Sequence, residues 1–285
     1  SRPYSQGNPM AGETLTSETL QGIDAWGAQH AAASVVGQRG VLASHGDSHR
    51  RFPVASVTKL ISSLAILVAV EEGTVSLEDQ AGPPGSTLRH LLSHSSGLSF
   101  ETDDVTAAPG VKRIYSNRGY ELAAEHLEIR AEMPFAEYVS EAVLEPLGLL
   151  DTSLDGSAAK DAVSTSADLC LLAREMLSPT LLDSSTWSMA TQVQFADLAG
   201  VVPGWGRYEP CPWGLGPELH GDKNPHWMGQ TASAQTYGHF GASGCFFWVD
   251  PVRRISCIVL TDRDFGDWAI NLWPGFCDQV RASIL

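Results

Sequence analysis

A serine and a lysine three residues apart stand at the start of the most apolar stretch of the chain. The segment Ser56-Val57-Thr58-Lys59 leads directly into an apolar run at residues 60–70. Residues i and i+3 share one face of a helix, about 5–6 Å apart, so Lys59 can reach the Ser56 hydroxyl. A serine becomes a nucleophile when a neighbouring base takes its proton, and a helix N-terminus favours the negative charge that develops. The pair therefore predicts acyl transfer through a serine.

The spacing alone carries little weight, because Ser-x-x-Lys is expected by chance about once in a chain of this length. A second copy runs from Ser157 to Lys160, after an Asp-Gly pair and before a polar run, which favours a loop or an exposed helix start. The apolar run after Lys59 instead predicts a buried helix, ended at Gly73, that holds Ser56 rigidly at its tip. The catalytic interpretation of Ser56 therefore depends on partners elsewhere in the chain.

Composition excludes several classes of function. The 285 residues are 43% hydrophobic and 18% charged, which is typical of a packed globular protein. The formal net charge of -15 argues against binding to nucleic acid or to an anionic membrane, and it requires any anion site to be local. The longest apolar run is too short to span a bilayer, so we expect no integral membrane segment.

The cysteines carry no metal or disulfide pattern. Their number is odd, they are scattered, and none forms a Cys-x-x-Cys pair or a zinc spacing. They are Cys170, Cys211, Cys245, Cys257 and Cys277. Cys245 and Cys257 can face each other across a hairpin, although apolar packing accounts for both. With no signal-peptide pattern at residues 1–12, we expect a cytoplasmic protein, while a processed N-terminus leaves export open.

The elements that must position Ser56 follow from hydrophobic patterning. Strand patterns at residues 33–38 and 40–44 precede it, and a hairpin pattern at residues 245–250 and 255–261 comes late in the chain. The stretch between them is mostly helical. An antiparallel sheet built from both chain ends, with a helical insertion between, explains this order.

This order predicts one domain over residues 1–285. Residues 15–60 and 200–285 would form an α/β lobe, and residues 61–199 a mostly helical lobe. Neither a repeat nor a linker separates them.

Some helices are predicted from capping residues and patterning. We expect a first helix at residues 17–29, a helix at residues 118–131 with Asn117 as its N-cap, and a closing helix at residues 268–285 that is interrupted at Pro274. Residues 186–198 have poor periodicity and receive no assignment.

Two later stretches supply groups that could act with Ser56. Tyr115 and Asn117 follow an irregular polar loop, and a His-Phe-Gly triplet begins at His239. The order and spacing of these stretches resembles the serine β-lactamase and penicillin-binding-protein superfamily, and its class C-like branch fits best. That branch includes D-alanyl-D-alanine carboxypeptidases, D-aminopeptidases and β-lactamase-like esterases. Four other segments resemble sequence motifs of that branch, at residues 91–98, 146–149, 164–169 and 247–251.

The resemblance implies a β-lactamase-like α/β (α+β) fold, with an antiparallel sheet flanked by helices and a mostly helical second lobe. It implies a serine hydrolase that forms an acyl-enzyme on Ser56, needs no cofactor and no metal, and takes a small-molecule ester, amide or peptide substrate. In the family, the lysine and tyrosine that match Lys59 and Tyr115 share the work of removing the serine proton and passing it to the leaving group.

The resemblance also assigns substrate-binding groups. Asn117 would bind Lys59 and the acyl side of the substrate, and His239 and Gly241 belong to the third motif. The backbone N–H groups of Ser56 and Ala242 would form the oxyanion hole.

The third motif departs from the family pattern. The family usually has Lys-Thr-Gly or His-Thr-Gly, whereas this chain has His239-Phe240-Gly241. A histidine with an ordinary pKa near 6.5 is mostly neutral at pH 7, and Phe240 removes a hydroxyl donor, so recognition of a carboxylate is weakened. We therefore expect neutral acyl esters or amides to be better substrates than penicillins. The loop at residues 97–115 is also short for the branch, which predicts an open cleft.

Several alternatives stay open. The protein could be a non-catalytic penicillin-binding-like or sensing homologue that keeps the pocket without turnover. Asn117 could be only a helix cap, and His239 only a structural residue. The aromatic residues of the segment after residue 203 could form the opposing wall of the cleft or plain core; they are Trp205, Tyr208 and Trp213. His90 and His94 have the i, i+4 spacing of a metal pair, but no Glu accompanies them, so we predict no metal site there.

Overall fold

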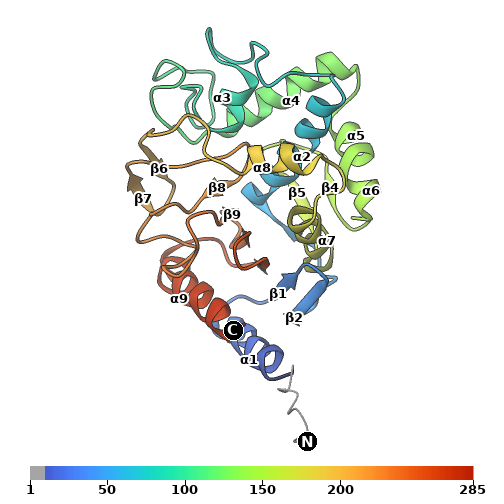
Figure 1. The fold of residues 1–285 in the computed structure, drawn as a ribbon, viewed down its shortest axis with the longest axis vertical. Coiled ribbons are helices and arrows are strands. Elements are labelled where there is room, and N and C mark those ends of the chain that lie inside the picture. The colour runs from blue at the N-terminus through green and yellow to red at the C-terminus, as the bar shows by residue number, and fades with distance from the viewer. Residues whose placement is uncertain (1–9, 285) are drawn as a thin grey trace, which may run out of the picture.

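The computed structural model describes residues 10–284 (Figure 1). Its centre is a six-stranded sheet in the order β2-β1-β11-β10-β9-β8, in which all neighbouring strands are antiparallel. The strands are β1 (Ala31–Gly37), β2 (Gly40–His45), β8 (Glu218–Leu219), β9 (Tyr237–Gly241), β10 (Cys245–Asp250) and β11 (Ile255–Thr261). Strands β1 and β11 come from opposite ends of the chain and pair along their full length. The predicted antiparallel sheet is therefore confirmed.

The two faces of this sheet are buried by different helices. On β10, Phe246 and Trp248 face helices α1 (Met10–Gln21) and α9 (Asp267–Ser283), whereas Phe247 and Val249 belong to the core on the other side. This is the side-chain alternation expected of a strand. Helices α1 and α9 lie side by side at the foot of Figure 1 and join the two chain ends.

The rest of the chain is mostly helical and covers the opposite face. Its helices are α2 (Thr58–Glu71), α3 (Leu88–Leu92), α4 (Asn117–Ala131), α5 (Phe135–Val139), α6 (Glu145–Leu147), α7 (Ser166–Leu177) and α8 (Ser184–Ala190). Short 3-10 turns lie at Gly22–Ala25 and Ala55–Val57, and a π turn at Ser140–Leu144. Two small antiparallel sheets complete the fold: β3 (Phe52–Pro53), β5 (Ala162–Ser164) and β4 (Ser153–Leu154) form one, and β6 (Gly200–Val202) and β7 (Gly206–Tyr208) the other.

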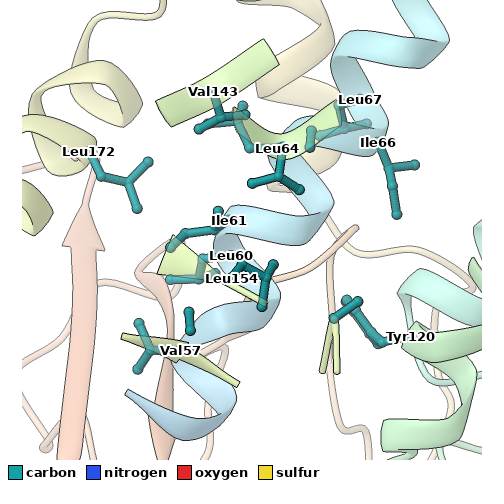
Figure 2. Close-up of a cluster of buried hydrophobic side chains, with 14 of the residues drawn as sticks. Val57, Leu60, Ile61, Leu64, Ile66, Leu67, Tyr120, Val143, Leu154 and Leu172 are labelled. Atoms are coloured by element: carbon teal, nitrogen blue, oxygen red, sulfur yellow. The ribbon is translucent and has the colours of Figure 1, made fainter. Parts of the chain in front are cut away.

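Helix α2 directly follows the 3-10 turn that contains Ser56 and carries Lys59 in its first turn. Every residue from Thr58 to Ala69 is buried, because other elements surround the helix. Figure 2 shows its aliphatic side chains among Tyr120 of α4, Leu154 of β4 and Leu172 of α7. Each large side chain buried in this way contributes about 1.5–3 kcal/mol to folding. The first turn of α2 is therefore held rigidly, as a nucleophile requires.

The structure corrects several predicted boundaries. Helix α1 ends at Gln21 and is followed by a 3-10 turn, instead of running through residues 17–29. Helix α9 continues through Pro274, because the neighbouring Trp273 and Phe276 are buried against the sheet and hold the helix despite the missing N–H. Part of the unassigned stretch at residues 186–198 belongs to α8.

The cysteines and the membrane prediction can also be compared with the structure. The five cysteines are buried as free thiols, and Cys245 and Cys257 pack into the cores on opposite faces of the sheet. Apolar packing therefore accounts for them. Within residues 10–284, no helix combines the length and the apolar character needed to cross a bilayer.

Candidate active site

The side chains of Ser56, Lys59 and Tyr115 meet at the first turn of α2. Lys59 Nζ lies 3.1 Å from Ser56 Oγ and 2.7 Å from Tyr115 Oη, and the Tyr115 hydroxyl donates a hydrogen bond to Ser56 Oγ at 2.7 Å. The three groups thus form a closed triangle of hydrogen-bonding atoms. Such a triangle can move a proton away from the Ser56 hydroxyl.

The surroundings of Lys59 favour a neutral amine. Its side chain is fully buried, and burial holds its pKa well below the ordinary lysine range, although the charge of Glu101 opposes this. Asn117 Oδ1 at 2.6 Å and the Ala159 carbonyl at 3.0 Å accept hydrogen bonds from Nζ. Both oxygens can only accept hydrogen bonds, so they bind the two hydrogens of a neutral Lys59 amine. The lone pair of Nζ is then directed toward the hydroxyl side of the site, where Ser56 lies.

Tyr115 has the opposite tendency. Burial raises the pKa of its phenol above the ordinary value, although the hydrogen bond to Ser56 opposes this shift. The phenol therefore stays protonated and acts as a donor. In this site the amine of Lys59 is the group able to accept the Ser56 proton, and Tyr115 is the group able to deliver one.

Asn117 is held by contacts on both sides of its amide. Its Nδ2 donates to Glu101 Oε1 at 2.9 Å while its Oδ1 accepts from Lys59. The predicted capping role was wrong: α4 begins at Asn117, and the N-cap is Ser116, whose hydroxyl accepts from the Gly119 N–H at 3.0 Å. Asn117 is therefore free to point its side chain at Lys59.

The turn that carries Ser56 fits against the end of β9. Ala55 has the left-handed φ of 46°, which costs a non-glycine residue about 1–3 kcal/mol and must be held by its surroundings. A Cβ added to Gly241 would lie 2.6 Å from the Val54 carbonyl and 3.2 Å from the Ser56 nitrogen, so only glycine fits here. Ala242 follows directly. This close approach brings the two segments together whose backbone N–H groups were predicted to bind an oxyanion.

His239 is a neutral residue in the wall of the site. It is buried, and its Nδ1 lies 2.7 Å from the Phe240 carbonyl, which can only accept, so Nδ1 carries the hydrogen. The pKa of His239 is lowered to about 3, mainly because the ring is buried away from water. His239 and Phe240 line a cavity of about 100 Å³ next to Ser56, together with Trp213. This wall offers no cation to a substrate carboxylate.

The aromatic residues after position 203 divide between the two predicted roles. Trp213 lines the cavity at Ser56, whereas Trp205 and Tyr208 are partly buried and pack against the hydrophobic core. The pocket is completed by Phe100, Val202 and Pro203. The cleft is thus walled by the loop at residues 97–115 and by the segment around β6.

Sequence reasoning missed two contributors to the site. Glu101 lies in a polar loop that gave no signal. The second Ser-x-x-Lys copy proves to be a support, because the Ala159 carbonyl binds Lys59 and the Ala158 carbonyl accepts from Ser62 Oγ at 2.6 Å. A backbone contact of this kind leaves no trace in the residue types.

His94, considered above as a metal ligand, instead contacts the Tyr115 segment. Its Nδ1 accepts a hydrogen bond from the Ser116 N–H at 3.1 Å, and its ring centroid lies 4.6 Å from that of Tyr115. Burial holds its pKa well below the ordinary range, so it is neutral. His90 lies apart from it, stacked on Phe195.

Comparison with known proteins decides the family. A family model described as Beta-lactamase matches residues 25–273. The chain belongs to the beta-lactamase family. The solved structure of a beta-lactamase from Mycobacterium bovis is 48% identical to this chain with a TM-score of 0.92, and the match covers 94% of this chain and 100% of that chain. The β-lactamase-like fold predicted from the sequence motifs is therefore confirmed.

Curated relatives within this family match over shorter stretches. D-alanyl-D-alanine-carboxypeptidase/endopeptidase AmpH of Escherichia coli is 28% identical over 137 residues, which is 35% of this chain and 36% of that protein. A putative D-alanyl-D-alanine carboxypeptidase of Salmonella enteritidis is 26% identical over 232 residues, which is 65% of this chain and 54% of that protein. The matches thus span between a third and just over half of these relatives.

A more distant structure shares the beta-lactamase fold. EstCE1, a hydrolase with promiscuous acyltransferase activity, is 17% identical with a TM-score of 0.75, over 97% of this chain and 99% of that chain. At this identity the likeness shows the fold alone.

Proposed function

We propose that this beta-lactamase family member is a serine hydrolase that forms an acyl-enzyme on Ser56 and hydrolyses small esters or amides that are neutral near the scissile bond. The observation that carries the proposal is the triangle of Ser56, Lys59 and Tyr115, with a fully buried lysine at its centre. The carboxypeptidase relatives of the same family support the reaction type.

Acylation begins when Ser56 Oγ attacks the substrate carbonyl carbon. The Oγ–C bond forms as the Oγ proton passes to the neutral amine of Lys59. The negative charge on the carbonyl oxygen is stabilised by the backbone N–H groups of Ser56 and Ala242. Tyr115 then gives its proton to the leaving oxygen or nitrogen, the bond to that atom breaks, and Lys59 returns a proton to Tyr115. The net transfer is one proton, from Ser56 to the leaving group.

Deacylation repeats these steps with water in place of the leaving group. The water oxygen bonds to the acyl carbon while its proton passes to the neutral amine of Lys59. The bond between Ser56 Oγ and the acyl carbon then breaks, and Oγ recovers a proton. The products are a carboxylic acid and the original hydroxyl of Ser56.

The walls of the pocket support the choice of substrate. His239 has no charge to offer a carboxylate, and Phe240 supplies a ring at the position where the usual motif of the resembled superfamily has a threonine. A cavity of about 100 Å³ suits a short acyl group. The ordinary β-lactam or peptide substrate carries a carboxylate close to the scissile bond, and this site gives that group no partner.

The proposal is tested by incubating the purified protein with a fluorophosphonate and then with a substrate panel. We expect a mass shift on the peptide that contains Ser56, and faster hydrolysis of p-nitrophenyl acetate than of a cephalosporin. A shift without turnover of any ester, amide or lactam would mean a binding or sensing protein. Faster hydrolysis of the cephalosporin would overturn the substrate choice but keep the serine hydrolase.

A further inference from the structure

A second, larger cavity adjoins the pocket at Ser56. Its volume is about 480 Å³, compared with about 100 Å³ for the pocket itself, and the two cavities share Phe100, Tyr115 and Pro203 as lining residues. We call the larger cavity the outer groove. It lies between the loop at residues 97–115 and the hairpin of β6 and β7. A substrate held at Ser56 can therefore extend past the ring of Tyr115 into this groove.

The outer groove has an apolar lining and a basic rim. Ile114, Val201 and Pro203 contribute to the apolar lining. Two of the apolar lining residues are strongly exposed, Val201 at 54% and Phe100 at 49%. Exposed apolar side chains that gather at one concave place are typical of binding sites. Lys112 and Arg207 add two exposed cations to the same lining.

The two cations of the outer groove, Lys112 and Arg207, contrast with the negative net charge of the molecule. The chain has a net charge of -15, yet Lys112 makes no ion pair with any residue in the described range 10–284. Among the described residues, Arg207 forms an ion pair with Glu209 alone, at 2.9 Å, and both of these side chains are more than 60% exposed. An exposed pair of this kind is weak, so an incoming anion can compete with Glu209 for Arg207.

We propose that the outer groove binds the leaving group of the substrate, an apolar chain that ends in an anion held by Lys112 and Arg207. This inference rests on the proposed function, in which Tyr115 gives its proton to the leaving atom. Because Tyr115 lines both cavities, the leaving group must pass its ring, whereas the small pocket with Ser56 and Ala242 holds the acyl group. The substrate class is thus an ester or amide of a short acid with a longer amphipathic alcohol or amine.

The test compares acetate esters that differ at the far end of the alcohol. Hexyl acetate has a neutral end, ω-acetoxyhexanoate carries a carboxylate, and ω-acetoxyhexyl phosphate carries a phosphate. We expect kcat/KM for at least one anionic ester to exceed that for hexyl acetate by about fivefold, mainly through KM, as two partly solvated charge pairs allow. The two anionic esters distinguish a carboxylate from a phosphate terminus.

A second experiment reverses the charges of the two groove cations. In the double variant Lys112→Glu/Arg207→Glu, the preference for the anionic ester should disappear or invert. Arg254→Glu is the matched control for charge reversal, because Arg254 is an exposed cation at the turn between β10 and β11 and does not line the groove. It should keep the preference of the unmodified protein. Binding of the anionic ester to Ser56→Ala protein, measured by calorimetry, should show the same dependence on the two rim cations.

The outcomes separate the two proposals. If all esters are hydrolysed at Ser56 with equal efficiency, or if the double variant keeps the preference for the anionic ester, the outer groove is not the anion site and the hydrolase proposal survives. If no ester is hydrolysed and Ser56 takes no label, the proposed function fails, and the assignment of the groove to a leaving group fails with it.

Discussion

The charge on Lys59 decides how Ser56 is activated. An ammonium group could stabilise negative charge but could not take a proton from serine. Burial shifts this lysine toward the neutral amine, and Asn117 and Ala159 orient it by accepting its hydrogens. The same burial keeps the Tyr115 phenol protonated. The two residues therefore divide the roles of base and acid, as their pKa shifts in opposite directions indicate.

This division predicts the pH dependence of ester hydrolysis. The active form has a neutral Lys59, so kcat/KM should fall as the pH drops through the lysine pKa. Because that pKa is lowered, the loss should occur well below the ordinary lysine range near 10.4. His239, with a pKa of about 3, should add no step between pH 5 and 8. A pH–rate profile with p-nitrophenyl acetate checks this, and a limb near pH 10 would contradict a neutral lysine.

Glu101 should act on the reaction through Asn117 and Lys59. Its charge raises the pKa of Lys59, and its carboxylate accepts from Asn117 Nδ2. Glu101→Gln keeps an acceptor but removes the charge, so the acid limb of kcat/KM should move to lower pH with little loss of rate. Glu101→Ala should show the same shift and also lose about tenfold in kcat, because Asn117 is no longer oriented.

The control for this prediction is Asp103→Asn. Asp103 is a 75% exposed carboxylate of the same loop, bound to Arg118 instead of Asn117. Its substitution should leave the profile in place. Identical profiles for the unmodified protein and both Glu101 variants would show that Glu101 has no part in tuning the base.

At the scale of elements, Arg113 joins three segments that wall the site. Its guanidinium is buried and, within the part of the chain that the structure describes, donates to backbone carbonyls alone, those of Ser93, Cys211, Phe195 and Gln194. Arg113→Met would leave several buried carbonyls unpaired, which costs about 1–3 kcal/mol for each group. We expect Tm to fall by about 5–10 °C. Thermal unfolding followed by circular dichroism measures this shift.

Arg51→Met is the matched control for Arg113. The Arg51 guanidinium is 62% exposed and pairs with Asp151 at 3.1 Å, so its loss should shift Tm by no more than about 2 °C. Equal shifts for the two arginine variants would mean that the carbonyl contacts of Arg113 do not hold the walls together.

The elements that sequence reasoning located best are those with a local signal. Helix α2 and the hairpin of β10 and β11 have continuous or alternating apolar patterns that only one structure satisfies. The interruption expected at Pro274 was wrong, because packing of Trp273 and Phe276 outweighs the local cost of proline. The first helix, expected at residues 17–29, was also misplaced, because α1 spans Met10–Gln21.

The same reasoning explains which site residues were found. Ser56 and Lys59 are three residues apart, so helix geometry alone places them together. Tyr115 and Asn117 needed the family motif, because they lie more than fifty residues away. Glu101 and the Ala159 carbonyl could not be predicted, since their contacts join distant loops and use residue types that have no characteristic pattern.

At the scale of the whole molecule, buried ionisable groups should make the protein sensitive to acid. Glu218 accepts from Lys223 at 2.7 Å and from His226 at 2.5 Å. Burial opposes its ionisation, but these partners hold the pKa of Glu218 below its ordinary range. Burial lowers the pKa of His226 to about 4, and that of His239 to about 3. All three groups lie on or next to the edge of the sheet at β8 and β9.

The lowered pKa values of Glu218, His226 and His239 all make the folded protein less stable as the pH falls. Below pH 6.5 the unfolded chain protonates both histidines while the folded protein does not, so stability falls as the pH drops from 6.5 toward 4. Glu218 contributes stability above its unfolded pKa near 4.3 and loses it below. We expect Tm at pH 5 to be clearly lower than at pH 7. His226→Gln should flatten this dependence, whereas His49→Gln, at an exposed position, should not.

The most direct test of the account traps the covalent intermediate. Protein mixed with p-nitrophenyl acetate is quenched in acid within the first turnover, digested and mapped by mass spectrometry. We predict an acetyl group on Ser56, and a loss of about 10²–10⁴-fold in its rate of formation in Lys59→Arg, because arginine cannot give up its proton. Lys160→Arg, in the second Ser-x-x-Lys copy, should acylate normally. An acetyl group on another residue, or equal rates in Lys59→Arg, would contradict the account.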